Sequence, residues 1–490
     1  MTDKYIADIG LEVHVELATR SKMFCSCAVV DPTAALPNSS VCEVCSGMPG
    51  VLPVINKRAV ELAIRAALSL NCEIAEISVF ARKNYFYPDL PKGYQISQYE
   101  QPLAERGYLS VKTGDGEKKI RVRRAHLEED TGKLTHITRN GESYSLVDLN
   151  RAGVPLLEIV SEPDMHSVED VRAYSRELRL LLRWLEVTSG DMEKGTLRFE
   201  ANVSMRPAGS SKLGTRVEIK NLNSFKTMEQ AIDYQLAVQK ALLDKGKKVR
   251  QETLGWNEAE NRTVPQRSKE EANDYRYFPE PDLPPLIIDR DWLEQIRQEI
   301  PELPAEKRKR YRNEYGLTSE DIERLIEDKE SALFFESCLE AAPKLEAKQI
   351  ANWMLTDLYA WLNAHSAPIS EIKISPEEFT DLIQLVEDGT INQNTGKEVL
   401  AEMLDAGKTP ARIIEEKGLK QISDSMQIAE MVRNTLDSNP DEVASYISGK
   451  ETVANWLFGQ VMKAAKGKAN PLLLKMELMD QLDTRRKNPG

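Results

Sequence analysis

The stretch Gly10-Leu-Glu-Val-His-Val-Glu-Leu17 decides the expected fold of the N-terminal part, because its side chains alternate in character. Apolar residues at 13, 15 and 17 alternate with Glu12, His14 and Glu16. This period of two is typical of a β-strand with one buried and one polar face. Residues 197–206 alternate in the same way, and residues 215–222 do so less regularly.

Helical stretches interrupt these strands. The spacing of apolar residues predicts helices over 57–70, 167–185 and 227–243. Because strands and helices do not alternate regularly along the chain, the pattern favours the α+β class over a doubly wound sheet.

Two breaks divide the rest of the chain. Four prolines between 279 and 285 mark the first, and Gly407 with Pro410 marks the second. The pattern from 292 to 405 is helical, and short helices are expected after 411. We therefore predict three domains, at residues 1–290, 291–408 and 409–490.

Composition supports a folded chain of several domains. At roughly 150 residues per domain, 490 residues predict about three domains. The 41% hydrophobic and 29% charged content argues against a disordered or collagen-like protein. The net charge of −13 argues against non-specific binding of nucleic acid by the whole chain. The last 80 residues are not acidic on balance, and Lys463, Lys466 and Lys468 form a basic group there.

No membrane association is expected. The sequence lacks a run of about 18 apolar residues, and its first residues lack the features of a signal peptide. The expected location is the cytoplasm, or an organelle after removal of a transit peptide.

Four of the six cysteines form a cluster. Cys25 and Cys27 make one close pair, and Cys42 and Cys45 make another. Two such pairs can hold one tetrahedral zinc, and four cysteines leave no open position for catalysis. We expect a structural zinc; the alternative is a set of buried thiols without a metal.

Several acidic residues are candidates for a second metal site. Glu12 and His14 are two residues apart, so a strand would place both on one face, and His126 with Glu128 can do the same. Each glutamate alone could belong to a solvated face. Glu158 is the exception, because it lies within the apolar run 155–160 and a buried carboxylate needs a partner. Glu200 lies on the polar face of its predicted strand.

Converging carboxylates repel one another unless a cation neutralises them. Oxygen ligands suit Mg²⁺, which commonly brings phosphate oxygens into its coordination shell. This chemistry indicates an ATP-dependent enzyme. The sequence has no P-loop motif and no nucleophile elbow.

Two groups of basic residues are candidates for binding phosphates. Arg82, Lys83 and Lys92 lie among aromatic residues in 80–95, a composition that could hold phosphates and stack a base. The alternative is a loop fixed by its aromatics. Arg216 and Lys220, on either side of Glu218, are the second candidates.

Seven motifs together resemble one family, the B subunits (GatB) of the aspartyl/glutamyl-tRNA amidotransferases. They cover residues 10–17, 84–98, 126–133 (His-Leu-Glu-Glu-Asp-Thr-Gly-Lys), 148–156, 159–164, 218–225 (Glu-Ile-Lys-Asn-Leu-Asn-Ser-Phe) and 274–285. The resemblance extends over essentially the whole chain.

The resemblance implies a fold and a reaction. The fold is a cradle domain similar to glutamine synthetase and guanido kinases, followed by an all-α helical domain and a small α-helical tail domain that hold tRNA. The partners are a glutaminase-like A subunit and a C subunit. The substrates are misacylated Glu-tRNA(Gln) and Asp-tRNA(Asn): ATP phosphorylates the side-chain carboxylate, and ammonia from glutamine displaces the phosphate.

The resemblance also implies roles for individual residues. His14, Glu128 and Glu158 match the family's magnesium ligands, and Glu12 lies beside them. Glu200 stands where many members have Asp, so its role is left open. The four cysteines match a zinc site that only some members have. Two other functions remain open, a stand-alone glutamine-synthetase-like ligase and a non-catalytic tRNA-binding scaffold.

Overall fold

The computed structural model describes residues 4–31, 33–114, 116–266, 274–420, 425–465 and 469–487. The chain divides into two compact units, Met1–Pro304 and Ala305–Gly490. Among the helices described, none has both the length and the apolarity required to cross a membrane.

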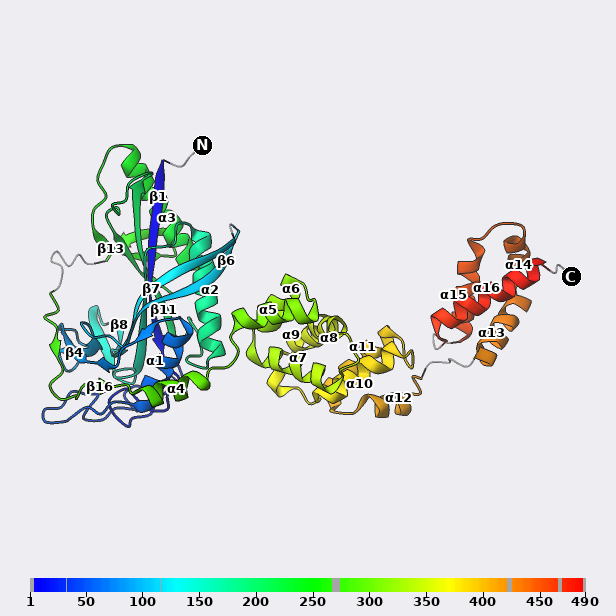
Figure 1. Cartoon of the computed structure of the whole chain (residues 1–490), viewed down its shortest axis with the longest axis horizontal. Coiled ribbons are helices and arrows are strands. Elements are labelled where there is room, and N and C mark those ends of the chain that lie inside the picture. Colours follow the sequence, from blue (N-terminus) through cyan, green and yellow to red (C-terminus); the bar gives the residue numbers. More distant parts are fainter. Residues whose placement is uncertain are drawn as a thin grey trace. The chain divides into compact units, whose positions relative to one another are not determined.

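A nine-stranded sheet forms the centre of the first unit (Figure 1). Its strands occur in the spatial order β14 (Arg262–Pro265), β13 (Glu252–Asn257), β12 (Val217–Leu222), β11 (Leu197–Pro207), β1 (Tyr5–Glu16), β10 (Pro155–Ser161), β7 (Gly116–Glu129), β6 (Ala104–Thr113) and β2 (Glu73–Ile74). Neighbouring strands are antiparallel except β12 and β13. The strands predicted around 10–17, 197–206 and 215–222 correspond to β1, β11 and β12.

Three helices cover one face of this sheet. They are α1 (Lys57–Ser69), α2 (Val168–Trp184) and α3 (Phe225–Asp244), within two residues of the predicted helices. Asn56, Ser167 and Ser224 cap their first turns by accepting hydrogen bonds from backbone N–H groups. Such caps satisfy donors that have no partner inside the helix.

The alternation of β1 explains which face the helices cover. Ile9, Leu11, Val13 and Val15 are at most 1% exposed and share one hydrophobic core with the three helices. Burying each such side chain contributes about 1.5–3 kcal/mol. The residues between them therefore point to the opposite, polar face.

Smaller sheets flank the large one. β15 (Phe278–Pro279), β4 (Phe80–Asn84) and β5 (Tyr94–Gln98) form a three-stranded sheet, while β16 (Leu286–Ile287) pairs with β3 (Ile77–Ser78). β8 (Lys133–Arg139) and β9 (Glu142–Asp148) form a separate hairpin. The side-chain oxygen of Gln98 accepts a hydrogen bond from the backbone N–H of Leu127 at 2.9 Å, which joins β5 to β7.

Helix α4 (Arg290–Gln298) still belongs to the first unit, because its Ile296 lies in the same hydrophobic core. The second unit is helical. Its α-helices are α5 (Pro304–Tyr315), α6 (Ser319–Ile326), α7 (Lys329–Ala341), α8 (Ala347–Trp353), α9 (Tyr359–His365), α10 (Pro376–Glu387), α11 (Gln393–Ala406), α12 (Pro410–Lys417), α13 (Ser425–Asp437), α14 (Pro440–Ile447), α15 (Val453–Ala464) and α16 (Pro471–Lys487). A π-helical turn (Met354–Leu358) joins α8 to α9, and a 3₁₀ turn (Ile369–Glu371) precedes α10.

The break predicted near 407 lies between α11 and α12. Gly407 ends α11 with φ of 64°, a left-handed conformation that glycine adopts at low cost, and Pro410 begins α12. Helices α13–α16 share a hydrophobic cluster of their own, which includes Val432, Leu457 and Leu478. Lys463 is exposed on α15, whereas Lys466 and Lys468 lie outside the described residues. The division of function among three domains stays a prediction.

Candidate functional site

The polar face of the large sheet carries a row of charged side chains from adjacent strands. His14 of β1 lies opposite Glu158 of β10, and Glu158 lies opposite His126 of β7. On the other side of β1, Glu12 lies opposite Glu200 of β11. Residues directly opposite in neighbouring strands share a face, so the register alone brings these five side chains to one surface.

His14, Glu128 and Glu158 form a compact triad within this row. The Nε2 atom of His14 lies 3.4 Å from Glu158 Oε2 and 3.6 Å from Glu128 Oε1. One potential ligand atom from each residue lies within 4.8 Å of the others. Both carboxylates belong to buried residues, and His14 is half-buried. One nitrogen and several carboxylate oxygens at this spacing suit a hard divalent cation.

The charges of the triad are strongly coupled. Burial disfavours a charged His14, but contact with Glu158 and the charge of Glu128 outweigh it and raise the pKa of His14 to about 9. Burial and the charge of Glu158 raise the pKa of Glu128. Burial also opposes ionisation of Glu158, yet His126, His14 and Lys83 hold its pKa well below the usual range. The charge of each member of the triad thus depends on its buried neighbours, above all on the contacts of Glu158 with His14 and His126.

A second group of carboxylates, Glu12, Glu200 and Glu218, lies along the same face. Glu12 accepts a hydrogen bond from Asn202 at 2.9 Å. Lys220 donates to Glu200 at 2.5 Å and lies 3.4 Å from Glu218. The sequence pattern placed Glu218 only beside two basic residues; pairing of β11 with β12 places it next to the other glutamates.

The five basic candidates have different surroundings. Arg82 makes two hydrogen bonds of 2.7 Å to Glu280, and Lys92 pairs with Glu129. Lys220 contacts Glu200 and Glu218, as above. Arg216 is exposed just before β12.

Lys83 differs from the other basic candidates, because it makes no ion pair within the described part of the chain. Burial would lower the pKa of Lys83, but the charges of Glu128 and Glu158 outweigh burial and raise it. An ammonium group that is under the influence of the triad's charges and makes no ion pair is available to a ligand.

The four predicted zinc ligands lie together in the loop between β1 and α1. The Sγ atom of Cys45 lies 4.0 Å from Cys27 Sγ and 3.9 Å from Cys42 Sγ, and all four sulfurs, including that of Cys25, are within 4.8 Å of one another. Ligands at about 2.3 Å from a tetrahedral zinc lie about 3.8 Å apart, so this donor set fits the ion.

A buried lysine, which no sequence pattern pointed to, completes the cysteine cluster. Lys22 is fully buried, and its ammonium donates to the carbonyls of Ser40 and Leu149 at 2.8 and 3.2 Å and to Cys45 Sγ at 3.5 Å. Four thiolates around one Zn²⁺ carry a net charge of −2, which an adjacent ammonium partly offsets.

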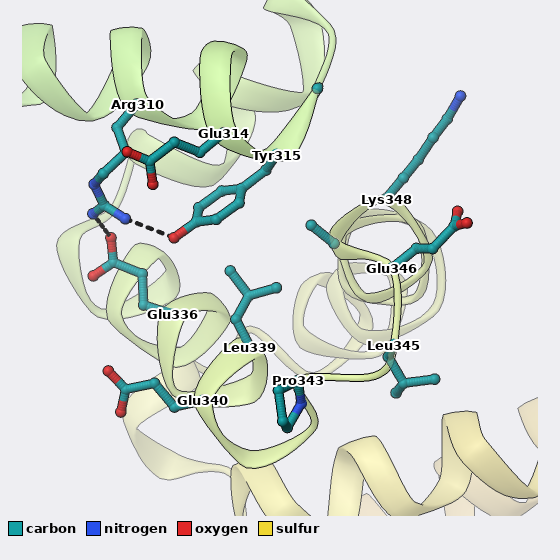
Figure 2. Close-up of a pocket in the computed structure, with 12 residues that line it drawn as sticks. Arg310, Glu314, Tyr315, Glu336, Leu339, Glu340, Pro343, Leu345, Glu346 and Lys348 are labelled. Carbon is teal, nitrogen blue, oxygen red and sulfur yellow. Dashed lines mark hydrogen bonds and ion pairs between the residues drawn. The ribbon is translucent and has the colours of Figure 1, made fainter.

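The helical unit contains a separate pocket of about 810 Å³ (Figure 2). Arg310 donates to Tyr315 at 2.8 Å and pairs with Glu336 at its edge, while Leu339 and Leu345 supply apolar lining. Its charged side chains at this edge already pair with each other, and it lacks the convergent carboxylates of the sheet. The charged row on the sheet is therefore the stronger candidate site.

Comparison with known proteins identifies the family of the chain. The model of the family described as "GatB/GatE catalytic domain" matches residues 7–294, which include the charged row, and the model described as "GatB domain" matches residues 333–482. Curated relatives that match nearly the full length are named as the B subunit of aspartyl/glutamyl-tRNA(Asn/Gln) amidotransferase.

The relative from Persephonella marina is 50% identical over 474 residues, 97% of this chain and 98% of its own length. The relative from Thermodesulfovibrio yellowstonii is 50% identical over 96% of this chain and 98% of its own length. The relative from Thermotoga maritima is 47% identical over 96% of this chain and 97% of its own length. The chain therefore belongs to the family of aspartyl/glutamyl-tRNA amidotransferase B subunits.

Proposed function

We propose that this chain is the tRNA-binding kinase subunit of a three-subunit amidotransferase. It would use ATP to convert Glu-tRNA(Gln), Asp-tRNA(Asn) or both into the amidated forms, in the cytoplasm, together with A and C subunits. The observation that carries the proposal is the triad of His14, Glu128 and Glu158 on the polar face, in a chain that matches amidotransferase B subunits over nearly its whole length.

The same observation argues against the two other functions. A non-catalytic scaffold would not need buried, mutually repelling carboxylates. A stand-alone ligase would not need the helical unit, which contributes about a third of the chain. Co-purification with A and C subunits, followed by amidation assays on both misacylated tRNAs, tests the proposal.

We infer that the sheet and its charged face form a cradle similar to that of glutamine synthetase and guanido kinases. Mg²⁺ would be held by His14 Nε2 and by oxygens of Glu128 and Glu158, and would supply neutralisation of phosphate oxygens. Lys83 would bind and orient the transferred phosphoryl group, since the charges of Glu128 and Glu158 act on its ammonium and no ion pair holds it among the described residues. Phosphoryl transfer depends mainly on positioning and charge neutralisation, so the chain needs no nucleophile of its own.

The reaction then follows from the chemistry of the substrate. An oxygen of the side-chain carboxylate attacks the γ-phosphorus, a P–O bond forms and ADP leaves. Ammonia then attacks the activated carbonyl carbon, loses a proton, and inorganic phosphate leaves.

The cysteine cluster is proposed to have a structural role. Zinc bound by four cysteines has no open position for substrate. The described residues of the loop 17–56 form no helix or strand, so the metal would take the place of a hydrophobic core there. The tail after residue 409 is proposed to contact tRNA, with Lys463 among the phosphate contacts.

The first prediction concerns the triad. Glu128→Ala and Glu158→Ala should each lower amidation by roughly 10²-fold or more, because one preorganised electrostatic group contributes about that much. Glu117→Ala, at an exposed position of the same strand as Glu128, is the control and should remain active. Glu200→Asp restores the residue common in the family and should keep much of the activity. Amidation assays of the assembled complex measure the rates of all four variants. Wild-type rates for both Glu128→Ala and Glu158→Ala would show that the site lies elsewhere.

The second prediction concerns pH. The pKa of His14 is about 9 without a metal, so His14 is protonated at pH 7, and a bound cation must displace that proton. Binding of Mn²⁺, a probe for the Mg²⁺ site, should therefore tighten with rising pH, by up to about tenfold per unit below pH 9. The affinity for Mn²⁺ at pH 7 and 8.5 can be measured by electron paramagnetic resonance, which detects the free ion. The pH dependence should become weaker in His14→Asn; equal binding by the wild-type protein at both pH values would contradict the assignment.

The third prediction concerns zinc. Protein purified without chelators should contain one zinc per chain. Cys42→Ser should lose the metal and lower the melting temperature more than it lowers the rate of ATP-dependent phosphorylation. Cys338→Ser, which changes a buried cysteine in α7, should keep full zinc content. Elemental analysis decides the matter, and absence of zinc from the wild-type chain would refute the assignment.

The fourth prediction concerns the tail. A chain ending at residue 410, assembled with A and C subunits, should show a raised KM for tRNA and unchanged glutamine hydrolysis. Because phosphate contacts release counterions, the truncated complex should also bind tRNA with a weaker dependence on salt. Unaltered tRNA affinity across a salt series would show that the tail does not contact tRNA.

A further inference from the structure

Two tyrosines that are far apart in the sequence stack beside the triad. The rings of Tyr99 and Tyr277 lie 4.2 Å apart between centroids, with an angle of 8° between their planes. Tyr275 meets Tyr277 edge to face at 6.1 Å. Tyr99 is 47% exposed although it takes part in the stack. An aromatic side chain with this exposure, held by a second ring, presents apolar surface to solvent.

The stack is fixed in place by the surrounding backbone. The side-chain amide of Asn84 donates to the carbonyls of Tyr275 and Arg276 at 3.2 and 2.9 Å. Pairing of β15 with β4 follows directly after Tyr277. On the other side, Tyr99 follows β5, which is bound to β7. The two rings are thus preorganised rather than parts of a free loop.

Two cations lie against these aromatic rings. The guanidinium carbon of Arg124 lies 5.7 Å from the centre of the Tyr99 ring, and the ammonium of Lys83 lies 5.1 Å from that of Tyr275. Within the described ranges, neither cation makes an ion pair. Cations beside exposed aromatic faces are typical of sites that bind nucleotides, where bases stack and phosphates are neutralised.

The stack is also adjacent to the proposed reaction site. The hydroxyl of Ser97, two residues before Tyr99, donates to Glu128 at 3.4 Å. Burial, together with the charges of Glu128 and Glu158, raises the pKa of Tyr277 to about 12 against the opposing effect of Lys83. Arg124 lies on the same strand face as His126 and Glu128.

We propose that Tyr99, backed by Tyr277 and flanked by Arg124, is the stacking platform for the 3′-terminal adenine of the aminoacyl-tRNA. This inference rests on the proposed function, because it names how the same site holds its substrate. A tRNA ends in an unpaired adenosine whose ribose carries the amino acid. Stacking the base on Tyr99 leaves the attached side chain free to extend towards Glu128 and Glu158.

An RNA end fits this surface for two reasons. Proteins recognise unpaired RNA bases by stacking them on aromatic rings and arginine planes, and both are present here. The exposed position of Tyr99 also leaves room for the nucleotides that precede the terminal adenosine, and Arg124 can neutralise one of their phosphates.

Equilibrium binding of uncharged tRNA to the assembled three-subunit complex tests the proposal, using intact tRNA and tRNA that lacks only the terminal adenosine. The wild-type complex should bind intact tRNA roughly 5- to 100-fold more tightly, the range that stacking of one base provides. Tyr99→Ala should abolish that preference by weakening only the binding of intact tRNA. Tyr99→Phe, which keeps the ring, should retain it.

Tyr144→Ala is the matched control, because Tyr144 is 46% exposed on the separate hairpin β8–β9. It should leave the preference unchanged. Equal binding of the two tRNAs by the wild-type complex would overturn the proposal, even if the complex amidates tRNA normally. A raised KM for ATP with an unchanged tRNA preference in Tyr99→Ala would show that the platform holds the adenine of ATP instead. Failure of the wild-type complex to amidate tRNA would refute the proposed function. The binding measurement does not depend on amidation, so it would still test the stacking platform.

Discussion

The antiparallel register of β1 between β10 and β11 is the constraint on which the first unit depends. It buries Val13 and Val15 under the helices and sets His14 beside Glu158 and Glu12 beside Glu200. A slip of one residue would move these charged side chains into the core. An unpaired buried charge costs about 3–5 kcal/mol, so the hydrophobic face and the charged face enforce the same register.

Some charged groups of this unit form closed ion pairs, whereas others make no ion pair within the part of the chain that the structure describes, and the contacts distinguish the two kinds. Arg198 and Arg151 both bind Asp130, at 2.9 and 3.2 Å, and Arg82 binds Glu280 through two hydrogen bonds. Such closed pairs join separate segments into one frame. At the triad, by contrast, Glu128 has a raised pKa and Lys83 has no ion-pair partner within the described residues. The ammonium of Lys83 is therefore open to a ligand, whereas the groups in the closed pairs are not.

Distant segments supply the parts of the site that surround the triad. The 274–287 segment returns to pair with β4 and β3, and it carries the tyrosines beside Lys83. The cysteine loop contacts the 147–149 segment through Asn38 and Lys22, which donate to the carbonyls of Val147 and Leu149. A metal in that loop would therefore stabilise the end of β9 as well as the loop itself.

The sequence by itself determined the local structure and the residue types that the candidate site contains. Strict alternation in 10–17 predicted β1 and its polar face, and apolar spacing predicted α1–α3. Two cysteine pairs predicted a cluster. These signals can be found in the sequence because they depend only on residues close together in the chain. Tertiary structure alone decided which charges are balanced. The pairing of Arg82 with Glu280, of Lys92 with Glu129 and of Lys220 with Glu200 joins residues 20 to 198 positions apart. The periodicity of apolar residues along the sequence carries no information about such pairs. Strand register and the packing of remote segments set the distance between two charged side chains.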